Sequence, residues 1–261
     1  MTPVMKISVL TPAYNSARTI ARTLDSFCAQ DWPDRELIVL DGASRDGTQA
    51  LVEGYARHNV RLVSQADGGM YDALNRGLDL FGGEVVGVLN SDDAYAGPGA
   101  LSQIAGALEG ADMVHGSLVF RDTGGRIVRR WPAEERPRGG FRAGWMPAHP
   151  TFYVRRHVAA AVGPFNQALA TAADYDWMLR AIETRSFTLA TLDAELIDMA
   201  IGGRSTRSLR AYLSHNLEAL SARQRWLGSG WIDYAMFAKP ARKISQFLSP
   251  ALPASGDLTR T

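Results

Sequence analysis

Short apolar runs alternate with helical patterns along the first 90 residues of the chain. Runs at residues 6–10, 36–40, 60–64 and 84–89 predict strands, and the segments 16–30, 46–58 and 71–81 predict helices. Ser16 is a typical N-cap residue for the first of these helices, whose Ile20, Leu24 and Phe27 share one face. Continuous apolar strands that alternate with helices favour a sheet covered on both faces. The pattern therefore predicts an α/β fold with a mostly parallel central sheet flanked by helices.

The pattern changes in the second half of the chain. Residues 113–120 and 126–131 flank the turn sequence at 122–125 and predict a β-hairpin. The Pro-, Gly- and Arg-rich segment 131–147 predicts a long, mobile loop. A short strand at 151–154, helices at 156–162 and 172–184, and a strand at 187–199 are expected to follow.

Two helical segments are predicted at the C-terminal end. Residues 205–227 carry leucines at helical spacing, and Gly228-Ser229-Gly230 interrupts the pattern. Residues 231–248 place aromatic and basic side chains on one short helix, which Pro240 should kink. This composition suits peripheral contact with a membrane surface, and packing on the parent domain or on a partner subunit is the alternative.

Composition narrows the class of protein. The 261 residues are enough for one large domain, with 46% hydrophobic and 21% charged residues. A net charge of +1 gives no reason to expect a nucleic-acid partner. The single cysteine, Cys28, is expected to act as a small buried hydrophobic residue. Neither a signal peptide nor a transmembrane run is recognisable, so the expected location is the cytoplasm, at the inner face of the membrane if the last helix binds lipid.

Polar residues follow three of the predicted strands. They are Thr11-Pro12-Ala13-Tyr14-Asn15, the acidic and glycine-rich segment 41–48, and Asn90-Ser91-Asp92-Asp93. Ligands of parallel sheets bind beyond the carboxyl ends of the strands. Two acidic sites at that edge suit a nucleotide diphosphate, because one carboxylate can bind base or ribose while another holds a divalent ion. Each motif alone is also a common turn or helix cap, but their joint placement favours function.

These motifs resemble those of the family-two inverting glycosyltransferases, which have the GT-A (Rossmann-like) fold. Residues 7–15 are similar to the family's first strand and nucleotide loop, and 41–48 to its Asp-Gly-Ser-x-Asp-Gly-Thr motif, with Ala43 as an extra residue. Residues 90–93 resemble its Asp-x-Asp-type metal motif, although Asn90 replaces a frequent Asp. Residues 69–77 resemble a branch common in bacterial surface-polysaccharide synthesis. The likeness extends over residues 5–205.

The resemblance implies roles for the first half of the chain. Asp41 would contact the base, Asp67 would line the nucleotide pocket, Asp92 would lie near the ribose or sugar, and Asp93 would ligate Mn²⁺ or Mg²⁺. The donor loop would contribute Thr11, Pro12 and Tyr14. For Asp72 and Asn75, lining the donor pocket and polarity of the first helical turn are both open.

The second half would bind the acceptor and supply a base. Residues 174–180 resemble the family's Glu-Asp-Tyr-Asp-x-x-x-Arg segment, with Ala173 in place of the Glu. Asp174 then matches the catalytic carboxylate, and an N-terminal helix carboxylate is the alternative. Asp176 lies about 200° away on the helix and is expected to pair with Arg180 at i,i+4.

Two basic residues have open roles. His149 precedes the strand at 151–154 and would touch the acceptor or the diphosphate, or be a structural imidazole. Arg204 lies in Gly202-Gly203-Arg204-Ser205 and would meet phosphate, unless this segment only caps a helix at Ser205.

The resulting hypothesis is a metal-dependent transferase. Residues 1–204 would form the GT-A domain, with a nucleotide half at 1–95 and an acceptor half at 96–204, and 205–261 a helical C-terminal extension. It would move a sugar from a nucleotide-sugar donor, with uridine favoured by the resemblance, to a glycan or lipid-linked acceptor. A sugar nucleotidyltransferase should carry a basic glycine-rich loop after the first strand, which residues 11–15 lack. A non-catalytic nucleotide-sugar-binding module is the other alternative.

Overall fold

The computed structural model describes residues 4–122, 124–200, 209–230 and 233–235. Nine strands of these segments form one sheet in the order β3-β2-β1-β4-β8-β6-β9-β5, with β7 paired to β6. The strands are β1 (Ile7–Ala13), β2 (Arg35–Asp41), β3 (Val60–Ser64), β4 (Val85–Val88), β5 (Asp93–Tyr95), β6 (Met113–Arg121), β7 (Ile127–Trp131), β8 (Tyr153–Arg155) and β9 (Leu189–Ala200). The α-helices are α1 (Ile20–Cys28), α2 (Thr48–Glu53), α3 (Met70–Leu80), α4 (Ala100–Leu108), α5 (Arg156–Val162), α6 (Ala173–Glu183) and α7 (Leu209–Leu227).

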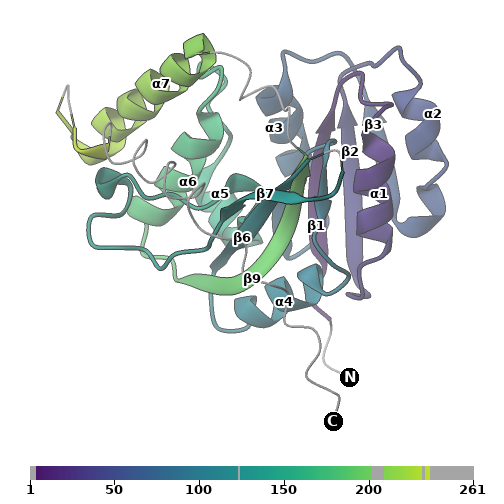
Figure 1. Ribbon diagram of the computed structural model, residues 1–261, viewed down its shortest axis with the longest axis horizontal. Helices are drawn as coiled ribbons and strands as arrows, with labels where there is room; N and C mark the ends of the chain where they lie inside the picture. Colours follow the sequence, from purple (N-terminus) through teal and green to yellow (C-terminus); the bar gives the residue numbers. More distant parts are fainter. Residues whose placement is uncertain (1–3, 123, 201–208, 231–232, 236–261) are drawn as a thin grey trace.

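The first four strands are parallel to one another. β1 pairs with β2 and β4, and β2 pairs with β3, so their carboxyl ends meet at one edge of the sheet. β8 pairs antiparallel with both β4 and β6, and β9 runs parallel to β6. This arrangement confirms the predicted α/β fold with its central sheet flanked by helices (Figure 1).

Alternation along each strand separates two cores. In β1, Ile7 and Val9 pack on the face covered by α1 and α4, whereas Leu10 packs on the face covered by α3 and α6. Figure 1 shows α1 and α2 on one side of the sheet and α3 on the other. Gly87 allows β4 to lie against β8, because a Cβ atom at this position would lie 2.2 Å from the Tyr153 ring.

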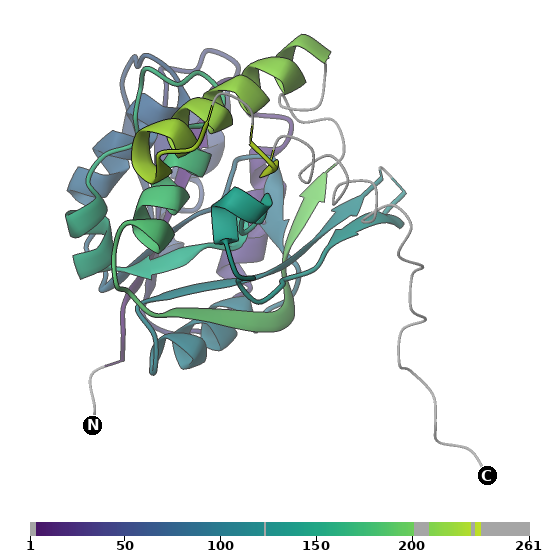
Figure 2. The ribbon, with the colours of Figure 1, turned by 90° about the vertical axis from the view of Figure 1, so that its left-hand side faces the viewer.

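The C-terminal helix α7 packs against α6, as Figure 2 shows. Arg223 of α7 is only 1% exposed, which is rare for a charged residue without a partner, and it is paired with Asp233. The predicted helix at 205–227 is therefore confirmed over its described part. The predicted helix at 231–248 lies outside the described residues except for 233–235. Within the described segments, no helix has the length and apolar character needed to cross a membrane.

Two helices begin or end differently from the prediction. The helix expected from Ser16 begins at Ile20, because the Ser16 side chain bonds to Ser91 rather than capping the helix. The helix expected over 46–58 stops at Glu53 and continues as a separate 3₁₀ turn at Ala56–His58. Gly54 is its C-cap residue, and glycine is a poor residue for continuing a helix.

The segment 131–147 is packed rather than a free loop. Phe141 is 0% exposed and Trp145 is 3% exposed, and the Trp145 indole donates to the Glu134 carbonyl at 3.1 Å. The aromatic residues of this segment pack into the core. The prediction of a mobile loop relied on the Pro and Gly content of the segment and did not consider its aromatic residues. The hairpin prediction is confirmed, since β6 and β7 pair antiparallel. Strand β5 and helix α4 were not predicted.

Cys28 ends α1 and is half-buried against the core. Burial raises the pKa of its thiol, which disfavours the reactive thiolate. The structure thus agrees with the prediction of a small hydrophobic residue.

Candidate active site

The loops beyond β1, β2 and β4 are bonded to one another at the carboxyl edge of the sheet. The Asn15 backbone N–H donates to the Ser44 hydroxyl at 2.8 Å, and the hydroxyls of Ser16 and Ser91 lie 2.9 Å apart. Asn15 has a φ of +49°, a conformation that asparagine tolerates better than most residues. The three polar segments that the sequence predicted to converge are therefore in direct contact.

Asp41 ends β2 and is completely buried. Its Oδ2 accepts hydrogen bonds from the Ser44 backbone N–H at 3.0 Å, the Gln49 amide at 3.0 Å and the Ser64 hydroxyl at 2.7 Å. Its Oδ1 is buried and has no hydrogen-bond partner among the described residues. Three donors on one oxygen fix the carboxylate, so the second oxygen is a preorganised acceptor for a ligand N–H or O–H group.

Asp67 lies against the start of the same loop. A Cβ atom on Gly42 would lie 3.0 Å from its Oδ2, so a larger residue there would have to displace the Asp67 carboxylate slightly. The Asp67 carboxylate also accepts from the Gly69 backbone N–H at 3.0 Å and from Arg76 at 3.4 Å. Asp67 therefore connects the loop beyond β2 to the start of α3.

The predicted donor loop is only partly a loop, because β1 extends beyond the expected residue 10 and includes Thr11 and Pro12, while Tyr14 follows the strand. Thr11 is 0% exposed, and its Oγ1 has no hydrogen-bond partner in the described part of the chain. Pro12 is buried as well, whereas Tyr14 is 57% exposed. A large aromatic side chain in solvent beside the loops of the sheet edge suits stacking on a flat ligand group.

The turn between β4 and β5 carries two adjacent carboxylates. Asp93 begins β5, is 0% exposed, and accepts from the Asn90 side-chain amide at 2.8 Å through its Oδ2. Its Oδ1 is buried and unpartnered within the described residues. Burial, and secondly the neighbouring Asp92 carboxylate, raise the pKa of Asp93 to about 7. Asp92 is partly exposed beside it.

These residues fit a divalent cation. The free Asp93 oxygen is a hard ligand of the kind that Mg²⁺ and Mn²⁺ prefer, and Asp92 adds negative charge next to it. The described residues contain no group of three or more His, Cys, Asp or Glu side chains that could hold a metal ion by themselves. A cation held here would therefore take most of its ligands from substrate and water, as Mg²⁺ usually does beside phosphates.

An arginine that the sequence analysis missed supports this turn. Arg22 of α1 donates to the Asp92 carbonyl and to the Asp198 carbonyl, both at 3.2 Å, and its guanidinium is paired with the Asp198 carboxylate at 3.1 Å. Arg121 pairs with the same carboxylate at 2.8 Å. The contacts join residues up to 176 positions apart, so no local sequence pattern signals them.

Asp174 lies at the start of α6, with Tyr71 and His149 beside it. Its Oδ1 accepts from the Tyr71 hydroxyl at 3.2 Å and from the Tyr175 backbone N–H at 2.8 Å, and its Oδ2 lies 3.8 Å from His149 Nδ1. Burial lowers the pKa of His149, although Asp174 opposes that shift. Burial also raises the pKa of Tyr71, so the phenol stays a hydrogen-bond donor.

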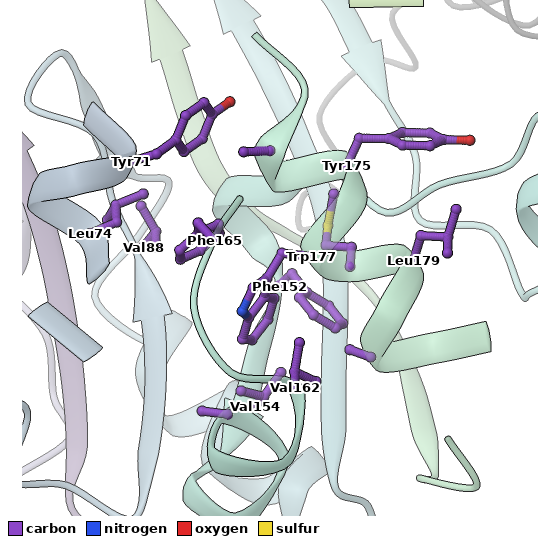
Figure 3. Close-up of a cluster of buried hydrophobic side chains, with 14 of the residues drawn as sticks. Tyr71, Leu74, Val88, Phe152, Val154, Val162, Phe165, Tyr175, Trp177 and Leu179 are labelled. Atoms are coloured by element: carbon purple, nitrogen blue, oxygen red, sulfur yellow. The ribbon is translucent and has the colours of Figure 1, made fainter. Parts of the chain in front are cut away.

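The aromatic packing of Figure 3 fixes the Tyr71 ring. Phe165 stacks on Tyr71 of α3 at a centroid distance of 6.0 Å and on Trp177 of α6 at 5.2 Å. The His149 ring meets the edge of Phe165 at 6.2 Å. Such aromatic pairs are geometrically specific. Two of the groups around the Asp174 carboxylate, Tyr71 and His149, are thus held by ring contacts to Phe165.

Asp176 has a different environment from Asp174. It is 2% exposed, its Oδ2 accepts from Arg180 Nε at 2.9 Å, and its Oδ1 accepts from the Trp226 indole at 2.8 Å. The predicted i,i+4 pair with Arg180 is confirmed. Both carboxylate oxygens are occupied, so Asp176 stabilises the helix and offers no free oxygen to a substrate.

The other uncertain polar residues of the sequence analysis now have partners. Asn75 exchanges two hydrogen bonds with the Phe165 backbone, at 3.0 and 2.7 Å. Asp72 accepts from the Gly68 backbone N–H at 2.9 Å and from Gln167 at 3.1 Å. Both residues hold loops in place. Arg204 lies outside the described residues.

Helix α3 joins the two parts of the site. The Asp67 carboxylate binds the backbone of Gly69 immediately before α3, and Tyr71 in the first turn of α3 binds Asp174. The structure therefore connects the carboxylates of the sheet edge with the carboxylate of α6 through one helical turn. The contribution of Tyr71 was missed, because its partner is 103 residues away.

Comparison with protein families gives one match that covers more than half of the chain. Residues 8–162 match the family described as "Glycosyl transferase family 2". A "PGL/p-HBAD biosynthesis glycosyltransferase" of Mycobacterium tuberculosis is 32% identical over 180 residues, which cover 66% of this chain and 68% of the relative.

Solved structures support the fold. TarS 1–349 of S. aureus, in complex with UDP-GlcNAc, has a TM-score of 0.69 at 20% identity, over 92% of this chain and 73% of that one. The mannosyltransferase PcManGT of Pyrobaculum calidifontis, in complex with GDP-Man and Mn²⁺, has a TM-score of 0.67 at 19% identity, over 97% and 78%. The chain spans 44% of a longer TarS structure. These similarities confirm the expected GT-A architecture.

The buried Asp93 carboxylate predicts a specific pH dependence of stability. Its pKa is about 7 in the folded chain and about 3.9 when unfolded, so its ionisation destabilises the fold increasingly between about pH 4 and pH 7. Asp93→Asn cannot ionise and should increase the free energy of unfolding at pH 8 by roughly 1–3 kcal/mol, measured by urea denaturation with a chelator. The gain should shrink at pH 5. Asp92→Asn removes only the second cause of the raised Asp93 pKa and should give a smaller gain. An Asp93→Asn protein no more stable than the wild type at pH 8 would contradict the assignment.

Proposed function

The chain belongs to glycosyl transferase family 2, and we propose that it moves a sugar from a nucleotide-sugar donor to an acceptor hydroxyl with inversion at the anomeric carbon. The observation that carries the proposal is the pair of buried, unpartnered carboxylate oxygens on Asp41 and Asp93 at the sheet edge. Burying such oxygens is unfavourable unless a ligand satisfies them.

The donor would occupy the carboxyl edge of the sheet. Asp41 would accept from the base, and Asp92 would contact ribose or sugar. Asp67 would line the nucleotide pocket together with Thr11 and Pro12 at the end of β1 and Tyr14 just after it. We propose a UDP-sugar, which the UDP-GlcNAc complex of TarS supports, while the GDP-Man complex of PcManGT makes a guanine nucleotide the competing donor in the test below.

A divalent metal, Mn²⁺ or Mg²⁺, would be held by Asp93 with Asp92 beside it. When bound, such an ion offsets negative charge on the departing diphosphate. The Mn²⁺ in the PcManGT complex supports metal use by a protein of the same fold. Asp93 is held rigidly for this task, because Asn90 binds its other oxygen and Arg22 holds the adjacent Asp92 carbonyl.

Asp174 would be the general base. The acceptor oxygen attacks the anomeric carbon as the bond to the diphosphate oxygen breaks, and the acceptor proton passes to the carboxylate. Oδ1 already accepts from Tyr71 and Tyr175, so Oδ2 is the oxygen left for the acceptor hydroxyl. His149 lies 3.8 Å from that oxygen and would orient the acceptor or the diphosphate.

The acceptor would be a glycan or a lipid-linked sugar of a bacterial surface polysaccharide or glycolipid. The relative named as a PGL/p-HBAD biosynthesis glycosyltransferase supports a role in biosynthesis. We also propose that residues 1–95 form the nucleotide half and 96–204 the acceptor half, followed by the extension 205–261.

The direct test of the proposed function is turnover. The purified chain with Mn²⁺ or Mg²⁺ should hydrolyse one of a panel of UDP- and GDP-sugars slowly, and the donor should be consumed faster when the acceptor is added. No turnover of any donor would leave only a binding module.

Removing the Asp93 side chain should abolish metal-dependent donor binding. Asp93→Ala removes the buried, unpartnered oxygen proposed to bind the cation, whereas the fold should persist because the substitution also removes a buried carboxyl group. Titration calorimetry with the nucleotide diphosphate should show that added Mn²⁺ no longer strengthens binding. Unchanged affinity and unchanged metal dependence would place the cation elsewhere.

Asp174→Asn should lower the rate of transfer by about 10²–10⁴-fold, the usual contribution of a positioned base. Donor affinity should stay unchanged, since the nucleotide binds at the sheet edge. Asp176→Asn is the matched control on the same helix, and it should lower thermal stability because it weakens a buried ion pair. Its folded fraction should turn over normally. Normal transfer by Asp174→Asn would make His149 the next candidate for the base.

We further propose that the segment 231–248 contacts the membrane surface. Asp233 is the partner of the buried Arg223, so a truncation must keep it. A chain ending after residue 235 should pellet less with anionic liposomes than the full chain, because it lacks Lys239, Arg242 and Lys243. Equal pelleting of the two forms would favour packing against the domain or a partner subunit.

A further inference from the structure

We propose that Glu218 of α7 is a positioning residue for Asp174, an inference that rests on the proposed function. Helix α6 begins one residue before Asp174 and has no side-chain cap of its own, because its N-cap residue is Ala172. The N–H groups at the start of a helix need acceptors, and alanine offers none. The Asp174 carboxylate accepts from the Tyr175 N–H, but an acceptor for the N-cap N–H must come from another element.

Glu218 supplies an acceptor for the N-cap residue and for the residue before it. Its Oε2 accepts from the backbone N–H groups of Thr171 at 2.8 Å and Ala172 at 2.9 Å, and from the Thr171 hydroxyl at 3.1 Å. The hydroxyl of Ser214 donates to Oε1 at 3.3 Å. A carboxylate at this end of a helix also interacts favourably with the helix dipole. Three hydrogen bonds to one charged oxygen fix the chain that leads into α6.

Three further contacts from α7 reach the same short stretch. His215 Nδ1 lies 3.0 Å from the Thr171 carbonyl, Arg223 donates to the Tyr175 hydroxyl at 2.8 Å, and Trp226 donates to Asp176 at 2.8 Å. Helix α7 thus holds residues on both sides of Asp174, while the Asp174 carboxylate itself faces Tyr71 and His149.

The contacts of α7 hold the backbone around Asp174 and leave its carboxylate free to meet a substrate, which is what a positioning role requires. The Asp174 carboxylate must meet the acceptor within hydrogen-bond distance, and a displacement of about 1 Å can reduce a rate by about 10²-fold. None of the Glu218 contacts involves the residues proposed to bind the donor. Loss of the carboxylate should therefore affect the transfer step and leave donor binding intact.

The test compares Glu218→Ala, Glu218→Gln and the control Gln224→Ala, whose side-chain amide donates to the Gly230 carbonyl just beyond the end of α7. Glu218→Ala should lower kcat for transfer by up to about 10²-fold, with unchanged donor KM and unchanged calorimetric affinity for the nucleotide diphosphate. Glu218→Gln keeps a carbonyl oxygen as acceptor and should recover most of the lost turnover. Gln224→Ala should match the wild type. Thr171→Val, which removes only the hydroxyl contact, should give a smaller change of the same kind if Glu218→Ala folds poorly.

Hydrogen exchange tests the contact independently of turnover. Amides of residues 171–176 should exchange faster in Glu218→Ala, while those of β1 and β2 should be unaffected. An unchanged kcat, or a parallel loss of kcat and donor affinity, would overturn the positioning role. If the wild-type chain turned over no donor, the proposed function would fail, and the exchange data would still decide whether Glu218 holds the start of α6.

Discussion

Two buried carboxylates with one free oxygen each are the constraint on which the rest of the site depends. Asp41 and Asp93 are both 0% exposed, and each has one oxygen that no described residue satisfies. An unsatisfied buried acceptor costs roughly 1–3 kcal/mol, and more when charged. Such groups persist only where surrounding bonds fix them, which explains the dense contacts among the loops at this edge. In Asp41, for example, the other oxygen accepts three hydrogen bonds, from Ser44, Gln49 and Ser64.

The second half of the chain reaches this edge through a few long-range contacts. Tyr71 links α3 to α6, Arg22 links α1 to the turn at Asp92 and to β9, and Glu218 links α7 to the start of α6. Each link joins two elements that are distant in sequence. Together, the links hold polar groups of the candidate site in place. The hydrophobic cluster around Phe165 keeps the Tyr71 link rigid.

Sequence reasoning succeeds where chemistry and local pattern coincide. The strand ends that deliver Asp41 and Asp93 follow from apolar runs closed by polar residues, and the pairing of Asp176 with Arg180 follows from helical spacing. It fails where a local signal competes with a tertiary contact. Serine is a preferred N-cap residue, yet the Ser16 side chain forms a hydrogen bond with Ser91, which is 75 residues away. The Pro- and Gly-rich segment before Pro147 suggested mobility, although Phe141 and Trp145 bury it.

Helix α6 shows how one element separates structural and chemical tasks. Asp174 and Asp176 are two residues apart and point in different directions, since successive residues of a helix turn by about 100°. Asp176 faces Arg180 and Trp226, and both of its oxygens are satisfied in a buried setting. Asp174 keeps 21% of its side chain exposed, and its Oδ2 lies 3.8 Å from His149 Nδ1. A carboxylate that must accept a proton needs a free lone pair and access to the acceptor, whereas one that stabilises a helix needs neither. The environments of the two carboxylates therefore support the proposal of Asp174 as the base, on physical grounds that do not depend on the family motif.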